Sequence, residues 1–159
     1  MRRHLLVTND FPPKVGGIQS YLWELWRRLP SEDVAVHTTP YAGADAFDAD
    51  QDFAVSRSRE PVLLPTRSLL RRVGRLADGM DAELVVWDPA LPVGHVAPRL
   101  DRPYAVVLHG AEVTVPGRLP VGRSLLARVL RSASLVICAG GYPAREATRV
   151  AGTELPVVV

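Results

Sequence analysis

The chain has 159 residues, of which 47% are hydrophobic and 23% are charged, which fits one globular domain and excludes a disordered or fibrous chain. The formal net charge of +2 gives no reason to expect nucleic acid as a partner. Cys138 is the only cysteine, which excludes a disulfide framework and a thiolate metal cluster.

Short apolar runs rich in β-branched residues recur along the chain and predict strands that are buried in a parallel sheet. They lie at residues 4–8, 33–38, 84–88, 104–108 and 135–138. Segments with apolar residues three and four positions apart alternate with these runs and predict helices. The predicted helices are residues 17–29, 66–78, 121–132 and 142–151. This alternation predicts an α/β fold with a doubly wound parallel sheet flanked by helices.

Two segments are less regular. Residues 39–65 are polar and contain glycine, which predicts a mobile loop with a weak strand near residues 53–56. The terminal LPVVV, Leu155 to Val159, predicts a strand that has only begun, so we expect the chain to be the first part of something longer. No apolar run approaches the ~18 residues of a membrane span, so we expect a soluble protein or one that lies on a membrane without crossing it.

Three stretches lie at the ends of predicted strands, where ligands bind in an open α/β sheet. They are NDFPPKVGGIQSY after residues 4–8, WDPALPVG at the end of residues 84–88, and HGAEV after residues 104–108. We expect these loops to line one crevice.

Gly16 and Gly17 stand where the first of these loops becomes a helix. Backbone amides at a helix start can face an anion, and glycine lets a phosphate approach closely. A tight turn with a helix cap and no ligand is the alternative. The spacing matches neither G-x-G-x-x-G nor the lysine-ending phosphate loop, so it supports neither a dinucleotide-binding fold nor an ATPase.

His109 stands at the end of a predicted strand, and Glu112 follows three residues later. Such a pair fits acid–base chemistry or a grip on sugar hydroxyls, although a histidine at this place can also be structural. His4, His37 and His95 have no ligand spacing with His109, so we expect no metal site.

The predicted helix at residues 66–78 has leucines and a valine on one face and arginines on another. Arg67, Arg71 and Arg75 recur every four residues, with Arg72 beside them. A basic amphipathic helix of this kind can lie on an anionic membrane, and an ordinary solvated helix face is the alternative.

The stretches VTNDFPPKVGGIQSYLWEL, LHGAEV, LRSASLVICAGGYPAREATRVAG and LPVVV together resemble the N-terminal half of the GT-B glycosyltransferases of family 4. The phosphatidylinositol alpha-mannosyltransferase group is the most similar. The resemblance covers most of the chain and is weakest across residues 39–65. It implies that residues 1–159 form a single Rossmann-like, acceptor-side domain, and that the C-terminal nucleotide-sugar-binding domain is absent from this chain. We therefore expect the isolated domain to be inactive.

The resemblance also implies roles for individual residues. Gly16 and Gly17 approach the donor pyrophosphate or a phosphate of the acceptor. His109 matches the family histidine that contacts the transferred sugar, so it is the candidate catalytic residue. The candidates on the acceptor side are Asp10, Gln19 and Glu112.

The sequence departs from the family pattern at three places. Ala111 stands where a bulkier polar residue is usual, and CAGGYPARE lacks the hydroxyl residues that cap the following helix. Trp87-Asp88-Pro89 stands where relatives tend to have small or aromatic residues and glycine. We therefore expect the acceptor pocket to differ from that of relatives.

By resemblance, the activity is that of a retaining hexosyltransferase without a divalent metal, which moves mannose from GDP-mannose to a phosphatidylinositol-type lipid. A sugar or small-molecule acceptor, or a non-catalytic module that binds an anion or a protein, are the alternatives. We expect no cofactor in this domain, and a nucleotide sugar as co-substrate. The expected partners are the lipid or sugar acceptor, an anionic membrane surface and a C-terminal domain of the same polypeptide. A cytoplasmic location fits, peripherally on the inner face of the cell membrane.

Overall fold

The computed structural model describes residues 2–111, 113 and 120–159. The strands are β1 (His4–Thr8), β2 (Val34–Thr38), β3 (Ala54–Arg57), β4 (Leu84–Asp88), β5 (Tyr104–Leu108), β6 (Leu135–Cys138) and β7 (Val157–Val158). The α-helices are α1 (Gly17–Trp26), α2 (Ala44–Ala49), α3 (Arg67–Gly79), α5 (Pro120–Ser132) and α6 (Gly141–Ala151). Two 3-10 helices complete the described elements, namely η1 (Ser31–Asp33) and η2 (Val93–Arg99).

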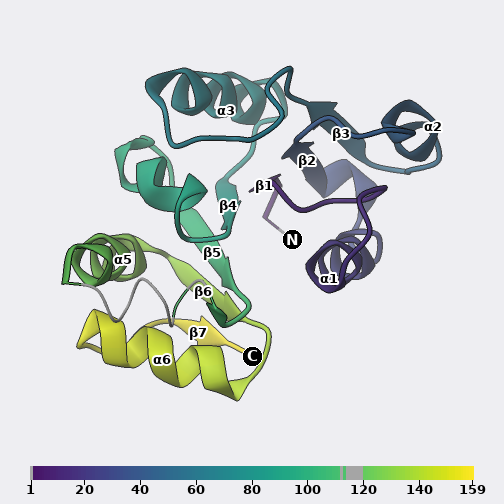
Figure 1. Cartoon of the computed structure of the whole chain (residues 1–159). Coiled ribbons are helices and arrows are strands. Elements are labelled where there is room, and N and C mark those ends of the chain that lie inside the picture. Colours follow the sequence, from purple (N-terminus) through teal and green to yellow (C-terminus); the bar gives the residue numbers. More distant parts are fainter. Residues whose placement is uncertain (1, 112, 114–119) are drawn as a thin grey trace.

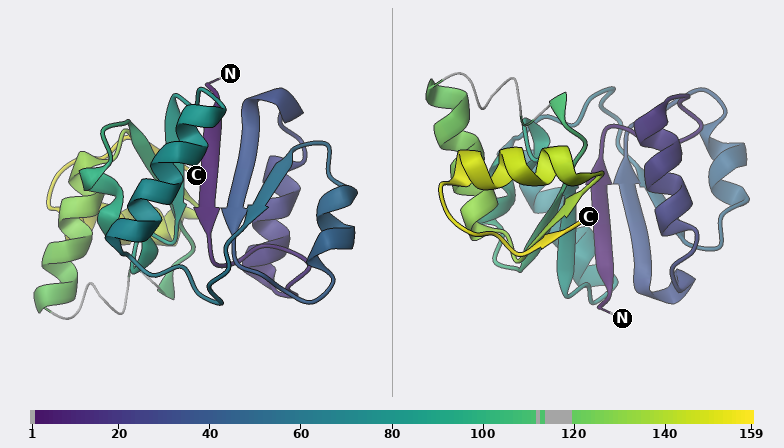
Figure 2. Two further views of the ribbon diagram at one scale, coloured as in Figure 1. Left: turned by 90° about the horizontal axis from the view of Figure 1, so that it is seen from above. Right: turned by 90° about the horizontal axis from the view of Figure 1, so that it is seen from below.

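The strands form one sheet in the order β3-β2-β1-β4-β5-β6-β7, and every pairing in it is parallel. The arrowheads of β1, β2 and β3 point the same way in Figure 2. The chain moves outward from β1 to β3, returns to β4 beside β1, and then moves outward in the other direction. This is the doubly wound arrangement that the sequence predicts, and its topological switch point lies between β1 and β4.

Apolar side chains of the strands alternate between two cores, one on each face of the sheet. Leu5 of β1 packs in the core beneath α3, while Leu6 packs in the core beneath α1. Leu22 and Trp26 of α1 belong to the second core, and Val73 of α3 belongs to the first. Figure 1 shows the result as layers, with α1 and α2 on one side of the sheet and α3 and α5 on the other.

The predicted strands and helices are confirmed, with small shifts at their ends. The strands at residues 4–8, 84–88, 104–108 and 135–138 have the predicted bounds. Helix α1 ends at Trp26, three residues before the predicted end, and Arg27 to Leu29 form a turn whose amides donate to carbonyls at the end of α1. The terminal LPVVV contains the short strand β7, which pairs with β6.

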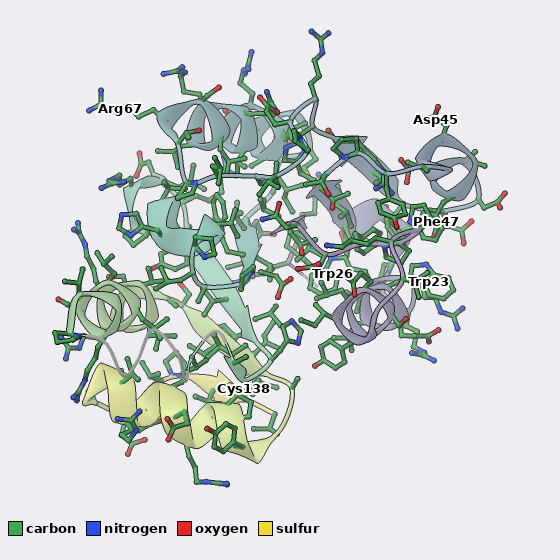
Figure 3. All side chains as sticks on the ribbon, viewed as in Figure 1. Trp23, Trp26, Asp45, Phe47, Arg67 and Cys138 are labelled. Carbon is green, nitrogen blue, oxygen red and sulfur yellow. The ribbon has the colours of Figure 1, made fainter. Side chains whose placement is uncertain are left out.

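The prediction of a loop with a weak strand at residues 39–65 was wrong in one respect. The strand is present as β3, but the segment also contains helix α2. Two tertiary contacts hold this short helix. The Arg57 guanidinium donates to both carboxylate oxygens of Asp48 at 2.9 and 2.7 Å, and Phe47 packs edge-on against Phe11 and Trp23. Figure 3 shows Phe47 beside Trp23, between α1 and α2.

Within the described residues, no helix combines the length and the apolar character that crossing a bilayer requires.

Candidate functional site

The carboxyl ends of β1, β4 and β5 meet at the switch point of the sheet. Thr8 and Asp88 are the last residues of β1 and β4 and are paired in the register. His109 follows β5 directly, and Gly110 behind it adopts a φ of 141°, a conformation that favours glycine. The three predicted crevice loops therefore begin side by side, as expected for an open α/β sheet.

A hydrogen-bonded chain joins these three strand ends. The hydroxyl of Thr8 donates to Oδ2 of Asp88 at 2.7 Å, and Nε2 of His109 lies 2.7 Å from Oδ1 of the same carboxyl group. Asp88 is only 1% exposed, and the His109 side chain is 12% exposed. The ring of Tyr21 from α1 meets the His109 ring edge-on, with centroids 5.6 Å apart.

The surroundings of Asp88 both raise and lower its pKa. Burial raises the pKa of this carboxyl group, and the negative charge of Asp10 acts in the same direction. The hydrogen bonds from His109 and Thr8 oppose the rise, and the net shift is upward. A buried carboxyl group beside a histidine, at the ligand-binding edge of a sheet, is the kind of pair that occurs in functional sites.

The loop that contains Gly16 lies on the α1 side of the hydrogen-bonded Thr8, Asp88 and His109 side chains. Gly16 precedes α1 in an extended conformation, and no side chain in the described structure caps the helix there. The side chain of Gln19 folds back over Gly16, so a side chain on Gly16 would overlap the Gln19 amide. Gly17 has no atom within 4 Å of the place that a Cβ would take. The helix start is therefore open at Gly17 and covered at Gly16.

Asp10 organises this loop. Its Oδ1 accepts hydrogen bonds from Nζ of Lys14 and Nε2 of Gln19, each at 2.7 Å, and its backbone N–H donates to the Thr8 hydroxyl at 2.9 Å. Gln19 is only 7% exposed. The predicted acceptor-side residues Asp10 and Gln19 thus contact each other, and Gln19 serves as a wall of the site rather than projecting freely.

Asn9 ties the other side of the loop to the segment that precedes α3. Its Oδ1 accepts from the backbone N–H of Leu63 at 2.7 Å, and its Nδ2 donates to the Leu63 carbonyl at 3.2 Å. We call these two hydrogen bonds the Asn9–Leu63 clasp. In them, the Asn9 side chain bonds both backbone polar groups of Leu63, as a residue of a neighbouring strand would. Beside it, Leu63, Leu64, Leu69 and Arg72 help to line a cavity of about 430 Å³ that is mainly apolar.

The predicted basic face of α3 divides into two groups. Arg67, Arg71 and Arg75 are exposed, and Figure 3 shows Arg67 pointing away from the body of the protein. Arg72 instead donates to both carboxylate oxygens of Glu60, at 2.7 and 3.1 Å. Thr66 caps the helix by accepting from the Leu69 amide. The structure thus separates Arg72 from the other three predicted residues.

The remaining predicted site residue, Glu112, lies outside the described residues. The other histidines stand apart from His109, since His4 packs against Trp26, His37 contacts Ser56 and His95 belongs to η2. In the described ranges, no group of three or more metal-binding side chains gathers at one place.

Sequence reasoning missed three residues of this site, namely Thr8, Lys14 and Asp88. The stretch WDPALPVG was expected to line the crevice, but Asp88 was not singled out in it. Its position as the last residue of an apolar strand was the signal that could have found it, because polar side chains at the carboxyl ends of strands face the ligand-binding edge.

Comparisons with known proteins agree with this picture. The chain is 38% identical over 152 residues to the GDP-mannose-dependent alpha-(1-6)-phosphatidylinositol monomannoside mannosyltransferase of Mycobacterium tuberculosis. The enzyme of the same name from Mycolicibacterium smegmatis is 34% identical over 146 residues. The resemblance to this mannosyltransferase group is confirmed. These alignments cover 89% and 87% of the chain, but the chain spans only 39% and 38% of the length of those relatives.

Solved structures share the fold. Anabaena Alr3699/HepE in complex with UDP matches 99% of this chain and 43% of that protein, with a TM-score of 0.71 and 20% sequence identity. Its complex with UDP-glucose gives a TM-score of 0.68 over 100% of this chain and 43% of that protein, at 19% identity. The Rossmann-like fold expected from the resemblance is confirmed. No protein-family model matches the sequence.

Proposed function

We propose that this chain is the acceptor-side domain of a retaining glycosyltransferase that moves mannose from GDP-mannose to a phosphatidylinositol-type lipid. The observation that carries the proposal is 38% identity over 89% of the chain to a GDP-mannose-dependent phosphatidylinositol monomannoside mannosyltransferase. The geometry agrees with it, because Asp88, His109 and the start of α1 share one edge of the sheet. Sugar hydroxyls and phosphates are ligands that such polar groups bind.

In this proposal, the start of α1 receives a phosphate. Amides in the first turn of a helix carry a partial positive charge, and Gly17 leaves room for a close approach. Lys14 lies in the loop before α1 with its side chain 41% exposed, and its ammonium group is paired with Asp10. Asp10 and Gln19 support this loop, and His109 contacts the sugar on the β5 side.

The donor-binding half of the enzyme is proposed to be a second domain that lies outside residues 1–159. The relatives are long enough for such a domain, since the chain spans 39% of the length of the Mycobacterium tuberculosis protein. The groups that bind the nucleotide and stabilise the leaving phosphate would then come from that domain.

Transfer assays on the full-length protein test the proposal. GDP-mannose and UDP-glucose should be supplied in parallel, each with phosphatidylinositol monomannoside and with a water-soluble sugar acceptor. We expect product with GDP-mannose and the lipid, and loss of at least about 100-fold in rate for His109→Ala. Asp45→Asn, an exposed change on α2, is the matched control that should keep the rate. Product with the water-soluble acceptor but not with the lipid would favour a sugar or small-molecule acceptor instead. No turnover of either nucleotide sugar would overturn the proposal of an enzyme.

The exposed arginines of α3 are proposed to face an anionic membrane. Arg67, Arg71 and Arg75 lie on one side of the helix, and Val62 and Leu64 before it are 51% and 57% exposed. Arginines that attract acidic lipids beside apolar side chains that enter the interface are the elements of a peripheral membrane contact. Arg72 has less part in this contact, because Glu60 neutralises it.

Vesicle binding separates these arginines. Changing Arg67, Arg71 and Arg75 to glutamine in the full-length protein should weaken binding to phosphatidylinositol-containing vesicles by on the order of 100-fold at low salt. Arg72→Gln is the matched control and should change binding by much less. Equal losses for the triple variant and for Arg72→Gln, or unchanged binding of the triple variant, would contradict this membrane contact.

A further inference from the structure

We propose that Asp88 is a positioning residue that keeps a proton on Nε2 of His109, so that Nδ1 is the ring nitrogen that gains and loses a proton. The contacts of Asp88 with Thr8 and His109 support this assignment. What the assignment means for catalysis rests on the proposed function.

Thr8 sets the direction of one of the two hydrogen bonds to Asp88. The backbone N–H of Asp10 donates to the Thr8 hydroxyl oxygen at 2.9 Å, so the hydroxyl hydrogen is available for Asp88. It points to Oδ2 of Asp88, 2.7 Å away. Nε2 of His109 lies 2.7 Å from Oδ1 of the same group. An ionised carboxylate accepts on both oxygens, so in the proposed arrangement Nε2 is the donor to Oδ1.

The carboxylate has little freedom to turn elsewhere. Asp88 is 1% exposed, and its backbone is fixed by pairing with Thr8 in the centre of the sheet. Tyr21 holds the other side of the arrangement, because its ring meets the His109 ring at an interplanar angle of 86°. The orientation of the imidazole is therefore set from two elements, β4 and α1.

Neutral imidazole has one donor nitrogen and one acceptor nitrogen. With the proton held on Nε2 by Asp88, the acceptor lone pair of the neutral ring lies on Nδ1. Removal of the Asp88 carboxylate takes away the contact that favours this tautomer. In this proposal, the Asp88 carboxylate therefore determines which ring nitrogen of His109 is the donor and which is the acceptor.

Other titratable and charged groups act on this pair or on its neighbours. Tyr21 from α1 contacts His109, and Cys138 at the end of β6 acts electrostatically on Tyr21. Asp10 acts on Asp88, and Lys14 pairs with Asp10. The Asp88 carboxyl group contacts the imidazole directly.

Nitrogen-15 NMR of the full-length protein with labelled histidines tests the inference without an activity assay. The signals of His109 are assigned by their loss in His109→Gln. On raising the pH, we expect the Nδ1 signal to move as this nitrogen loses its proton, while Nε2 keeps the signature of a protonated nitrogen. Deprotonation of Nε2, an even mixture of tautomers, or a ring that stays doubly protonated wherever the protein is folded would each overturn the inference.

Variants add a second readout. Asp88→Asn preserves the shape but replaces one carboxylate oxygen with an amide donor, and it should give mixed tautomers at His109. Thr8→Ser keeps the hydroxyl and should preserve the wild-type signature, whereas Thr8→Val should weaken it. Asp45→Asn serves as the matched control for the loss of one carboxylate. Retention of the wild-type tautomer in folded Asp88→Asn would overturn the role of Asp88.

If the transferase activity is present, Asp88→Asn should lower kcat by about 100-fold with a smaller change in KM, as expected when a reacting group loses its alignment. An inactive wild-type protein that has the expected nitrogen signature would overturn the proposed function and leave the positioning role supported. An active protein with the opposite tautomer would overturn the positioning role alone.

Discussion

The amide oxygen of Gln19 occupies the space that a side chain on Gly16 would need. Gly16→Ala should therefore push the Gln19 side chain away and break its hydrogen bond to Asp10. Because the displaced group is the end of a flexible side chain, we expect a loss of about 1 kcal/mol in the free energy of unfolding. Urea denaturation measures it.

Gly17→Ala is the matched control for stability, because position 17 is open and lies in the first turn of α1. Alanine favours helix more than glycine, so this variant should be as stable as the wild type or more stable. Equal destabilisation by Gly16→Ala and Gly17→Ala would contradict the prediction that overlap with Gln19 is what destabilises Gly16→Ala.

The clasp between Asn9 and Leu63 should be measurable by hydrogen exchange. Asn9→Ala removes the acceptor of the Leu63 amide, so that amide should exchange faster, with a stability loss of about 1–2 kcal/mol. Asn9→Asp keeps an acceptor for the Leu63 amide, while it removes the donor to the Leu63 carbonyl and adds a negative charge. It should protect the amide better than alanine does, and equal exchange in both variants would refute the clasp.

The ion pair of Arg72 with Glu60 predicts a titration. The hydrogen bond from Arg72 is the main cause that lowers the pKa of Glu60 from 4.5 to about 2. In carbon-13 NMR of the side-chain carboxyl groups, Glu60 should therefore titrate near pH 2. In Arg72→Gln its pKa should return toward 4.5, while Arg71→Gln should leave it unchanged. The pair contributes to stability above pH 4.5, and this contribution is lost as the pH falls toward 2.

The buried His37 predicts a pH dependence of folding in a different range. Burial is the main cause that lowers its pKa from 6.5 to about 4, and the positive charge of Arg72 acts in the same direction. The unfolded state therefore binds more protons between these values, and stability should fall as the pH falls from 6.5 to 4. The loss from this residue is on the order of 3 kcal/mol.

The difference between wild type and His37→Leu isolates that loss, because other titrating groups are common to both proteins. Urea denaturation from pH 4.5 to 7.5 should give a shallower pH dependence for His37→Leu than for the wild type. Parallel curves for His37→Leu and wild type would exclude His37 as a source of the acid sensitivity.

Much of the fold could be predicted from the sequence, because strands that are buried on both faces consist of continuous runs of apolar residues. The bounds of β1, β4, β5 and β6 followed directly from such runs. Helix α2 could not be predicted in this way. It has six residues and carries aspartates at two of them, and it depends on Arg57 and on contacts with Phe11 and Trp23.

The site was predictable in outline but not in its contacts. Strand ends and glycines marked the loops that form the crevice, and the family resemblance drew attention to His109. The partner of His109 is 21 residues away, and the partner of that carboxyl group, Thr8, is 80 residues away. Contacts of this range depend on strand register, and no local pattern reports them.

Thr8, the last residue of β1, and the two residues after it each contact a different neighbour, because their side chains continue the alternation of the strand. Thr8 points to the α1 side of the sheet, where it bonds Asp88, and Asn9 points to the opposite side, toward Leu63. Asp10 returns to the α1 side and bonds Lys14 and Gln19. Deleting one residue at this point would reverse the alternation. The side chains that face the two walls of the crevice would then be exchanged, so the number of residues from β1 to Asp10 is as much a part of the site as any side chain in it.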